Sequence, residues 1–254
     1  KKPLQAKFYG TDKKLPIHNK AEMDELLEKL ENAEYEITEV KKGERTKNAP
    51  LPFTTSTLQQ EAAKTLNFST QKTMRLAQQL YEGIDIKGSG TVGLISYLRT
   101  DSTRISQEAD EAARAYIGEQ YGEHYVSTNE KVLKKDQKIQ DAHEAIRPTD
   151  ISRTPVMVKE SLSRDQFRLY QLIWKRFTAS RMSAAKYETT SVKIGAGEYT
   201  FTVAASKIIF DGFMSVYMQE EDNQKSNVLS QSLEKGMNLQ LTELKPEQHF
   251  TPPP

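Results

Sequence analysis

The chain of 254 residues is 36% hydrophobic, and its 36 Lys and Arg residues nearly balance 35 Asp and Glu residues, for a formal net charge of +1. That length accommodates one large domain or two ordinary ones. The even balance excludes a uniformly basic protein, so any nucleic-acid site must be local. The absence of cysteine excludes disulfides and thiolate metal sites. Because no apolar run approaches about 18 residues and no signal-peptide core is visible, we expect a cytoplasmic protein without a membrane segment.

Residues 1–50 are predicted to form a strand, a helix and a second strand. Apolar and polar residues alternate over 4–8, as in a half-buried strand. Asn19 is a plausible N-cap for a helix whose apolar residues recur at helical spacing. A second strand is expected to begin at Tyr35, and the charged, proline-punctuated stretch 41–52 is interpreted as a linker.

A mainly helical segment is expected over 51–155. Ser56 and Ser69 are placed to cap two short helices separated by a tight turn, with a strand pair after them. This order is typical of a helix-turn-helix with a wing. A strand over 94–97 and a helix capped by Ser106 are predicted to follow.

The pattern changes again after residue 156. A long helix is predicted to begin at Ser163 or Asp165 and to end near Met182, with an aromatic stripe on its buried side. Four strands are then expected, over 189–194, 199–204, 212–218 and 239–244.

The predicted fold class is therefore α+β with more than one domain. A β-rich module, formed by 1–50 and 156–254, is interrupted by the helical domain 51–155. The sequence starts without Met and ends on Thr251 followed by three prolines, which leads us to expect an internal part of a longer protein.

The run Gly93–Arg104 concentrates groups suited to phosphodiester chemistry. A free phenol, with a pKa of about 10, is a poor nucleophile at neutral pH, but a guanidinium beside it favours the phenolate and the charge on a phosphorane. In a strand, Arg99 shares the face of Tyr97, as does Asp101 if the strand continues. The alternative is a strand tyrosine packed on a sheet before an ordinary polar turn. Hydroxyls able to donate to phosphates follow at Thr100, Ser102 and Thr103.

A second candidate segment is Asp141–Thr149, which contains His143. A histidine can donate a hydrogen bond to a phosphate oxygen or assist proton transfer, and Arg147 adds a guanidinium that can bind phosphate. The alternative is a surface histidine in a salt-bridged loop. The sequence does not predict how far this segment lies from Tyr97.

Other chemical patterns are weak. A basic stripe at Arg164, Arg168 and Lys175 either follows a nucleic-acid backbone or is a solvated helix face. The acidic run 220–222 lacks the spaced carboxylates of a magnesium site, and no glycine-rich phosphate loop precedes a helix. We therefore expect no metal site and no use of ATP.

Four segments together resemble bacterial type IA DNA topoisomerases and follow the order of that family. They are Pro52–Gln60, Gly90–Ser106, Ala142–Thr149, and Leu169–Phe177 with its continuation Ala179–Met182.

The resemblance implies roles for the candidate residues. Tyr97 would form a 5′-phosphotyrosine link with one DNA strand, Arg99 would position and neutralise the scissile phosphate, and His143 would hydrogen-bond a phosphate. Asp101 and Thr100 would support this network. Contacts with DNA would come from Ser102, Thr103, Arg104 and Arg147.

The resemblance also implies an architecture. The helical domain would be the CAP-like winged-helix domain that carries the tyrosine, and the β-rich module would be the arch over the central hole. The reaction would relax negatively supercoiled DNA without ATP by acting on a single-stranded segment. The family's N-terminal TOPRIM domain, which binds Mg²⁺, has no counterpart in the sequence, so we expect no cofactor on this part, Mg²⁺ in the full enzyme, a monomer, a nucleoid location, and no relaxation by this part alone.

Two rival functions stay open. A tyrosine recombinase would place its tyrosine late in the chain and attach it to the 3′ end of DNA, whereas here Tyr97 precedes His143. A non-enzymatic winged-helix module would bind duplex DNA sequence-specifically, but leaves the residues around Tyr97 unexplained. Other type IA members also remain possible within the family.

Overall fold

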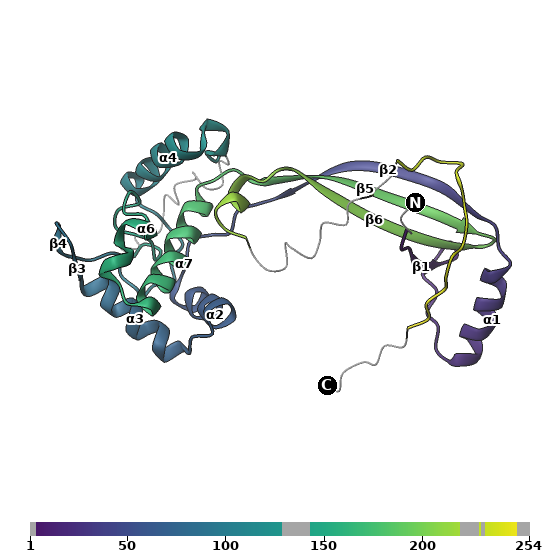
Figure 1. Ribbon diagram of the computed structural model, residues 1–254, viewed down its shortest axis with the longest axis horizontal. Helices are drawn as coiled ribbons and strands as arrows, with labels where there is room; N and C mark the ends of the chain where they lie inside the picture. Colours follow the sequence, from purple (N-terminus) through teal and green to yellow (C-terminus); the bar gives the residue numbers. More distant parts are fainter. Residues whose placement is uncertain (1–3, 129–142, 219–228, 230–231, 248–254) are drawn as a thin grey trace. The chain divides into compact units, whose positions relative to one another are not determined.

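The computed structural model describes residues 4–128, 143–218, 229 and 232–247. The chain divides into two compact units. The first comprises 1–45, 187–209 and 220–254, and the second comprises 46–186 and 210–219. Figure 1 shows the helices and strands along the chain, and the strands β2, β5 and β6 continue across the boundary between the units.

The first unit is built on a five-stranded sheet with the strand order β1-β6-β5-β2-β7. β1 pairs antiparallel with β6, and β7 pairs antiparallel with β2. Figure 1 shows β2, β5 and β6 as the long strands of this sheet. The strands are β1 (Lys7–Gly10), β2 (Tyr35–Lys47), β5 (Ala185–Ala196), β6 (Tyr199–Phe210) and β7 (Asn238–Leu239).

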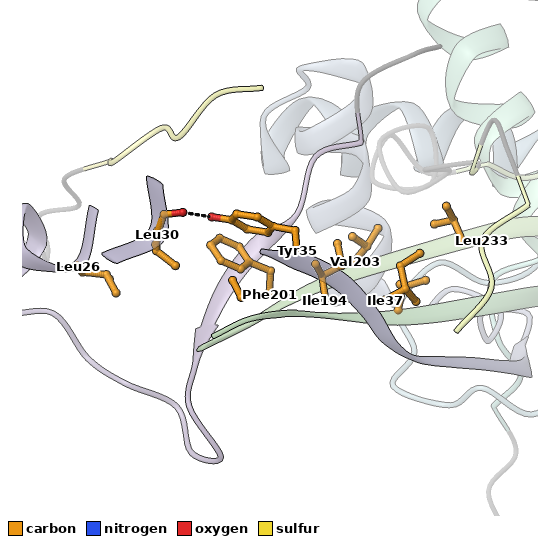
Figure 2. Packing of buried hydrophobic residues seen from close by; sticks show 10 residues of the cluster. Leu26, Leu30, Tyr35, Ile37, Ile194, Phe201, Val203 and Leu233 are labelled. Atoms are coloured by element: carbon orange, nitrogen blue, oxygen red, sulfur yellow. Dashed lines mark hydrogen bonds between the residues drawn. The ribbon is translucent and has the colours of Figure 1, made fainter. Parts of the chain in front are cut away.

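Helix α1 (Lys20–Glu31) packs its apolar stripe against this sheet. Asn19 caps the helix by accepting a hydrogen bond from the backbone N–H of Glu22, as the sequence predicted. Leu26 and Leu30, one turn apart, join the buried cluster of the sheet, and the hydroxyl of Tyr35 donates to the carbonyl of Leu30 over 2.9 Å (Figure 2).

The second unit contains the remaining helices of the described residues. They are α2 (Thr55–Leu66), α3 (Thr70–Glu82), α4 (Gln107–Tyr121), α6 (Pro155–Val158) and α7 (Arg164–Ser180), with short 3₁₀ turns η1 (Glu123–Tyr125), η2 (Lys159–Ser161) and η3 (Gly212–Ser215). A hairpin of β3 (Ile84–Ile86) and β4 (Gly90–Val92) follows α3. The expected order of two helices and a strand pair is confirmed.

Helix α7 is the centre of the second unit. It contacts α2, α3, α6 and η3, and its aromatic stripe is buried. The hydroxyl of Tyr170 donates to the carbonyl of Arg153 over 2.7 Å, and the indole N–H of Trp174 donates to the carbonyl of Ile151 over 2.9 Å. Burial raises the pKa of Tyr170 well above its usual range. The compact units thus place α7 with the helices, whereas the predicted boundary at 155/156 assigned it to the β-rich module.

Several predicted elements differ from the observed ones. The interpretation of 41–47 as linker is wrong, because β2 continues to Lys47. A side chain of this stretch still has a partner on β5, because the guanidinium of Arg45 lies 4.3 Å from the ring centre of Tyr187. This part of the strand is exposed and carries charged side chains, and its composition alone did not distinguish it from a linker.

Smaller corrections concern caps and strand ends. The N-cap of α2 is Thr54 rather than Ser56, and it forms a capping box with Thr57. Ser69 and Ser106 cap their helices as predicted, and Ser163, one of the two expected starts of the long helix, is the N-cap of α7. The predicted strand 212–218 contains the turn η3 instead, and the predicted strand 239–244 is reduced to β7. The charged loop expected over 131–141 lies outside the described residues.

Candidate active site

Tyr97 is an exposed residue of the second unit, on a segment in which exposed and buried residues alternate. Its side chain is 44% exposed, whereas its neighbour Leu98 is buried. Arg99 and Asp101 are exposed as well, and Thr100 between them is buried. The expected period of two is therefore present from 97 to 101. The predicted strand 94–97 is not: only Ile95 forms an isolated bridge.

The segment that holds Tyr97 is paired with the segment that holds His143. The backbone N–H of Ser96 donates to the carbonyl of Arg147 over 2.8 Å, and the N–H of Arg147 donates back to the Ser96 hydroxyl over 2.9 Å. That hydroxyl donates to the carbonyl of Ala145 over 2.8 Å. Ile95 and Pro148 form an antiparallel bridge beside these bonds. Two segments about fifty residues apart thus become one local framework.

This pairing places Tyr97 and His143 on the same pocket. The pocket has a volume of about 250 Å³ and is lined by Ser96, Tyr97, His143 and Glu144. Both aromatic side chains are exposed. An exposed phenol and an exposed imidazole at one opening can meet the same phosphate group from solvent.

Arg147 is held within the second segment. Its Nε donates to Glu144 over 2.8 Å, and its Nη1 donates to the carbonyl of Pro148 over 3.0 Å. Both members of the ion pair are largely shielded from solvent. The guanidinium therefore stabilises the lip of the pocket in this conformation, and its predicted contact with phosphate stays a prediction.

The hydroxyls after Arg99 are partly used inside the chain. The oxygen of Thr100 accepts from the N–H of Ser102 over 3.0 Å, and the oxygen of Ser102 accepts from the N–H of Arg104 over 3.1 Å. The carbonyl of Arg104 in turn accepts from the N–H of Ala145. Thr100 is thus a buried support, whereas Thr103 and Arg104 are exposed.

Besides Ser96, two residues near Tyr97 were not identified from the sequence as part of the site. Tyr81, in the last turn of α3, packs edge-on against the ring of Tyr97 with ring centres 5.5 Å apart. Thr55, the first residue of α2, is hydrogen-bonded to the backbone of Leu98 and Thr100. The only signal for Thr55 was its place in Pro52–Gln60, where it had no role.

The described part of the chain contains no group of three or more His, Cys, Asp or Glu residues that could hold a metal ion. The same residues include no helix long and apolar enough to cross a membrane. The acidic run at 220–222 lies outside the described residues.

Comparison with known proteins identifies the family. A family model described as DNA topoisomerase matches residues 3–254. The structure of full-length topoisomerase I from Thermotoga maritima is similar, with a TM-score of 0.74 and 37% sequence identity, over 93% of this chain and 39% of that one. The chain therefore spans about two fifths of that relative's length. The match extends over the segments of Tyr97 and His143 alike, and the chain belongs to the DNA topoisomerase family.

Proposed function

We propose that this chain carries the strand-cleaving tyrosine of a type IA DNA topoisomerase, an isomerase that relaxes negatively supercoiled DNA. The observation that carries the proposal is the shared pocket of Tyr97 and His143, both exposed, within a chain of the DNA topoisomerase family. The substrate is a single-stranded segment of the duplex.

The reaction is a transesterification. The phenol oxygen of Tyr97 attacks the phosphorus of a DNA phosphodiester, the bond from phosphorus to the 3′ oxygen breaks, and a 5′-phosphotyrosine forms. The phenol loses its proton and the departing 3′ oxygen gains one, so atoms and charge balance. Religation is the reverse step. One ester replaces another, so the cycle needs no ATP.

The neighbours of Tyr97 stabilise the charge that develops on the phosphate. Arg99 neutralises the charge on the phosphate. Its guanidinium is available for this role, because Arg99 is exposed and has no ion pair among the described residues. His143, which lines the same pocket as Tyr97, hydrogen-bonds a phosphate oxygen. Asp101 and the buried Thr100 support the arrangement. Ser102, Thr103 and Arg104 bind neighbouring phosphates. Arg147 also binds a phosphate when its ion pair with Glu144 opens.

The metal requirement belongs to a different part of the enzyme. The described residues offer no metal-binding group, so no step here is assigned to a metal. The family resemblance assigns Mg²⁺ to a TOPRIM domain in cis. The enzyme works as a monomer at the nucleoid, and this chain alone does not relax supercoiled DNA.

Trapping of the covalent adduct tests the proposal. The full-length topoisomerase that carries this chain is mixed with Mg²⁺ and single-stranded DNA labelled at either the 5′ or the 3′ end, then denatured. The 3′ label should remain on the protein, because the tyrosine holds the 5′ phosphate. Tyr97→Phe should abolish the adduct, while Tyr9→Phe, at an exposed tyrosine of the other unit, should leave it.

Two outcomes would overturn this assignment. An adduct that persists in Tyr97→Phe would remove Tyr97 as the nucleophile. Retention of the 5′ label instead of the 3′ label would favour recombinase-like chemistry.

A binding module without catalysis is the second candidate. The order α2, α3 and the β3–β4 hairpin is that of a winged helix, which favours duplex binding. It gives no role to the Tyr97 pocket. Sequence-specific duplex binding without any covalent adduct would support it.

A further inference from the structure

The segment Phe53–Thr57 contacts both segments that line the pocket. Phe53 is fully buried, forms an isolated bridge with Ile146, and accepts a hydrogen bond from its N–H over 2.8 Å. Two residues later, Thr55 reaches the segment of Tyr97. One short stretch before α2 therefore contacts both the histidine segment and the tyrosine segment.

Thr55 binds the backbone on both sides of Arg99. Its hydroxyl donates to the carbonyl of Leu98 over 2.7 Å and accepts from the N–H of Thr100 over 2.9 Å. Its own N–H donates to the carbonyl of Thr100 over 2.9 Å. The carbonyl of Thr100 also lies 3.1 Å from the hydroxyl, as a second acceptor. A single side chain thus fixes two peptide groups of the catalytic run.

The helix does not need this hydroxyl. The N-terminus of α2 is already capped by Thr54, whose side chain accepts from the N–H of Thr57 while the Thr57 hydroxyl accepts from the N–H of Thr54. Among the described residues, the Thr55 hydroxyl is bonded only to the tyrosine segment. Its interactions therefore concern the position of residues 98–100.

We propose that Thr55 is a positioning residue for Tyr97 and Arg99, an inference that rests on the function proposed above. Leu98 and Thr100 alternate with these two exposed residues, so their peptide groups set the directions in which the phenol and the guanidinium leave the backbone. Thr55 acts through the backbone of Leu98 and Thr100 and is assigned no role in the bond-making step itself. Its β-branched side chain has few rotamers, which keeps the hydroxyl in place.

The effect of losing the hydroxyl should appear in the cleavage step. A displacement of about 1 Å at a reacting group costs on the order of a hundredfold in rate. The Thr55 N–H still holds the Thr100 carbonyl in any variant, so we expect the Thr55→Val enzyme to form the adduct about 10 to 100 times more slowly in a single turnover. Affinity for single-stranded DNA, measured with the calcium-loaded or metal-free enzyme, should change by less than about twofold.

Thr55→Val and Thr55→Ser form a matched pair. Valine keeps the shape of threonine without the hydroxyl, whereas serine keeps the hydroxyl, so Thr55→Ser should restore the rate to within about threefold of the parent. Thr73→Val is the structural control, because its buried hydroxyl also donates to a carbonyl, that of Ser69, away from the tyrosine segment. Thr73→Val should lower the melting temperature and leave the single-turnover rate unchanged.

The test uses the full-length enzyme, and the melting temperature of each variant shows whether it is folded. If Thr55→Val does not fold, Thr55→Ala is used, since alanine suits the first turn of a helix. A normal cleavage rate in a folded variant without the hydroxyl overturns the inference, as does an equal loss in Thr55→Ser. If Tyr97→Phe also retains its adduct, the proposed function fails; if Tyr97→Phe loses it, only the role of Thr55 fails.

Discussion

Ser96 and Arg147 are joined by two hydrogen bonds. The backbone N–H of Ser96 donates to the carbonyl of Arg147 over 2.8 Å, and the backbone N–H of Arg147 donates to the hydroxyl of Ser96 over 2.9 Å. Ser96 directly precedes Tyr97, and Arg147 lies four residues after His143. The pocket that contains both predicted catalytic side chains therefore depends on a serine that was not among the predicted site residues.

Removal of the Ser96 hydroxyl should loosen this junction. Ser96→Ala leaves the N–H of Arg147 and the carbonyl of Ala145 without their partner, which costs about 1 to 3 kcal/mol for a buried group and less for this half-buried one. We expect a lower melting temperature and slower adduct formation, both recovered in Ser96→Thr. Ser215→Ala, which loses a similar bond to Gly212 in η3, should alter stability without slowing cleavage.

The two guanidiniums at the site should respond differently to salt. Arg99 is exposed and, among the described residues, has no ion pair, whereas Arg147 is bonded to Glu144. Each phosphate contact on a single strand contributes about 0.7 to the slope of log affinity against log salt concentration. Titrations at several salt concentrations should show a slope lower by about this amount for Arg99→Ala and a smaller change for Arg147→Ala. Equal slopes for the parent and Arg99→Ala would argue against a phosphate contact.

The sheet of the first unit should be sensitive to its buried apolar residues. Ile37 on β2 is fully buried in the cluster of Figure 2, so Ile37→Ala should destabilise this unit by about 2 to 5 kcal/mol. Ile209 on β6 is 51% exposed, and Ile209→Ala should change the unfolding free energy by less than about 0.5 kcal/mol. Urea unfolding followed by circular dichroism measures both. A similar loss in the two variants would contradict the packing described.

Local signals in the sequence predicted local structure well. Asn19, Ser69 and Ser106 each accept a hydrogen bond from the backbone N–H three residues later, at the start of the helix that they cap. Such a cap depends on neighbouring residues only, so a local sequence pattern is enough to predict it. The linker interpretation of 41–47 failed because pairing with a distant strand, rather than composition, decides whether a charged stretch is extended.

The candidate catalytic side chains could be named from the sequence, but the way the fold brings them together could not be predicted. Tyr97 and His143 stand in recognisable segments, yet the bonds that join those segments connect Ser96 with residues 49 and 51 positions away. Thr55 acts over 43 positions. Contacts of this kind depend on tertiary packing, and the periodicity of apolar residues in the sequence does not predict them.

The ion pair between α3 and α7 should make stability depend on pH. Lys72 lies 2.6 Å from Asp165, and its hydrogen bond lowers the pKa of that carboxyl. A lowered pKa contributes stability above the unfolded value of about 3.9, and this contribution is lost as pH falls through the folded value. Asp165→Asn should therefore lower the urea midpoint at pH 7 and have a smaller effect at pH 3. Because both side chains are about one-third exposed, the difference at pH 7 should also shrink in high salt. A difference that is constant from pH 7 to pH 3 would show that the carboxylate charge does not contribute.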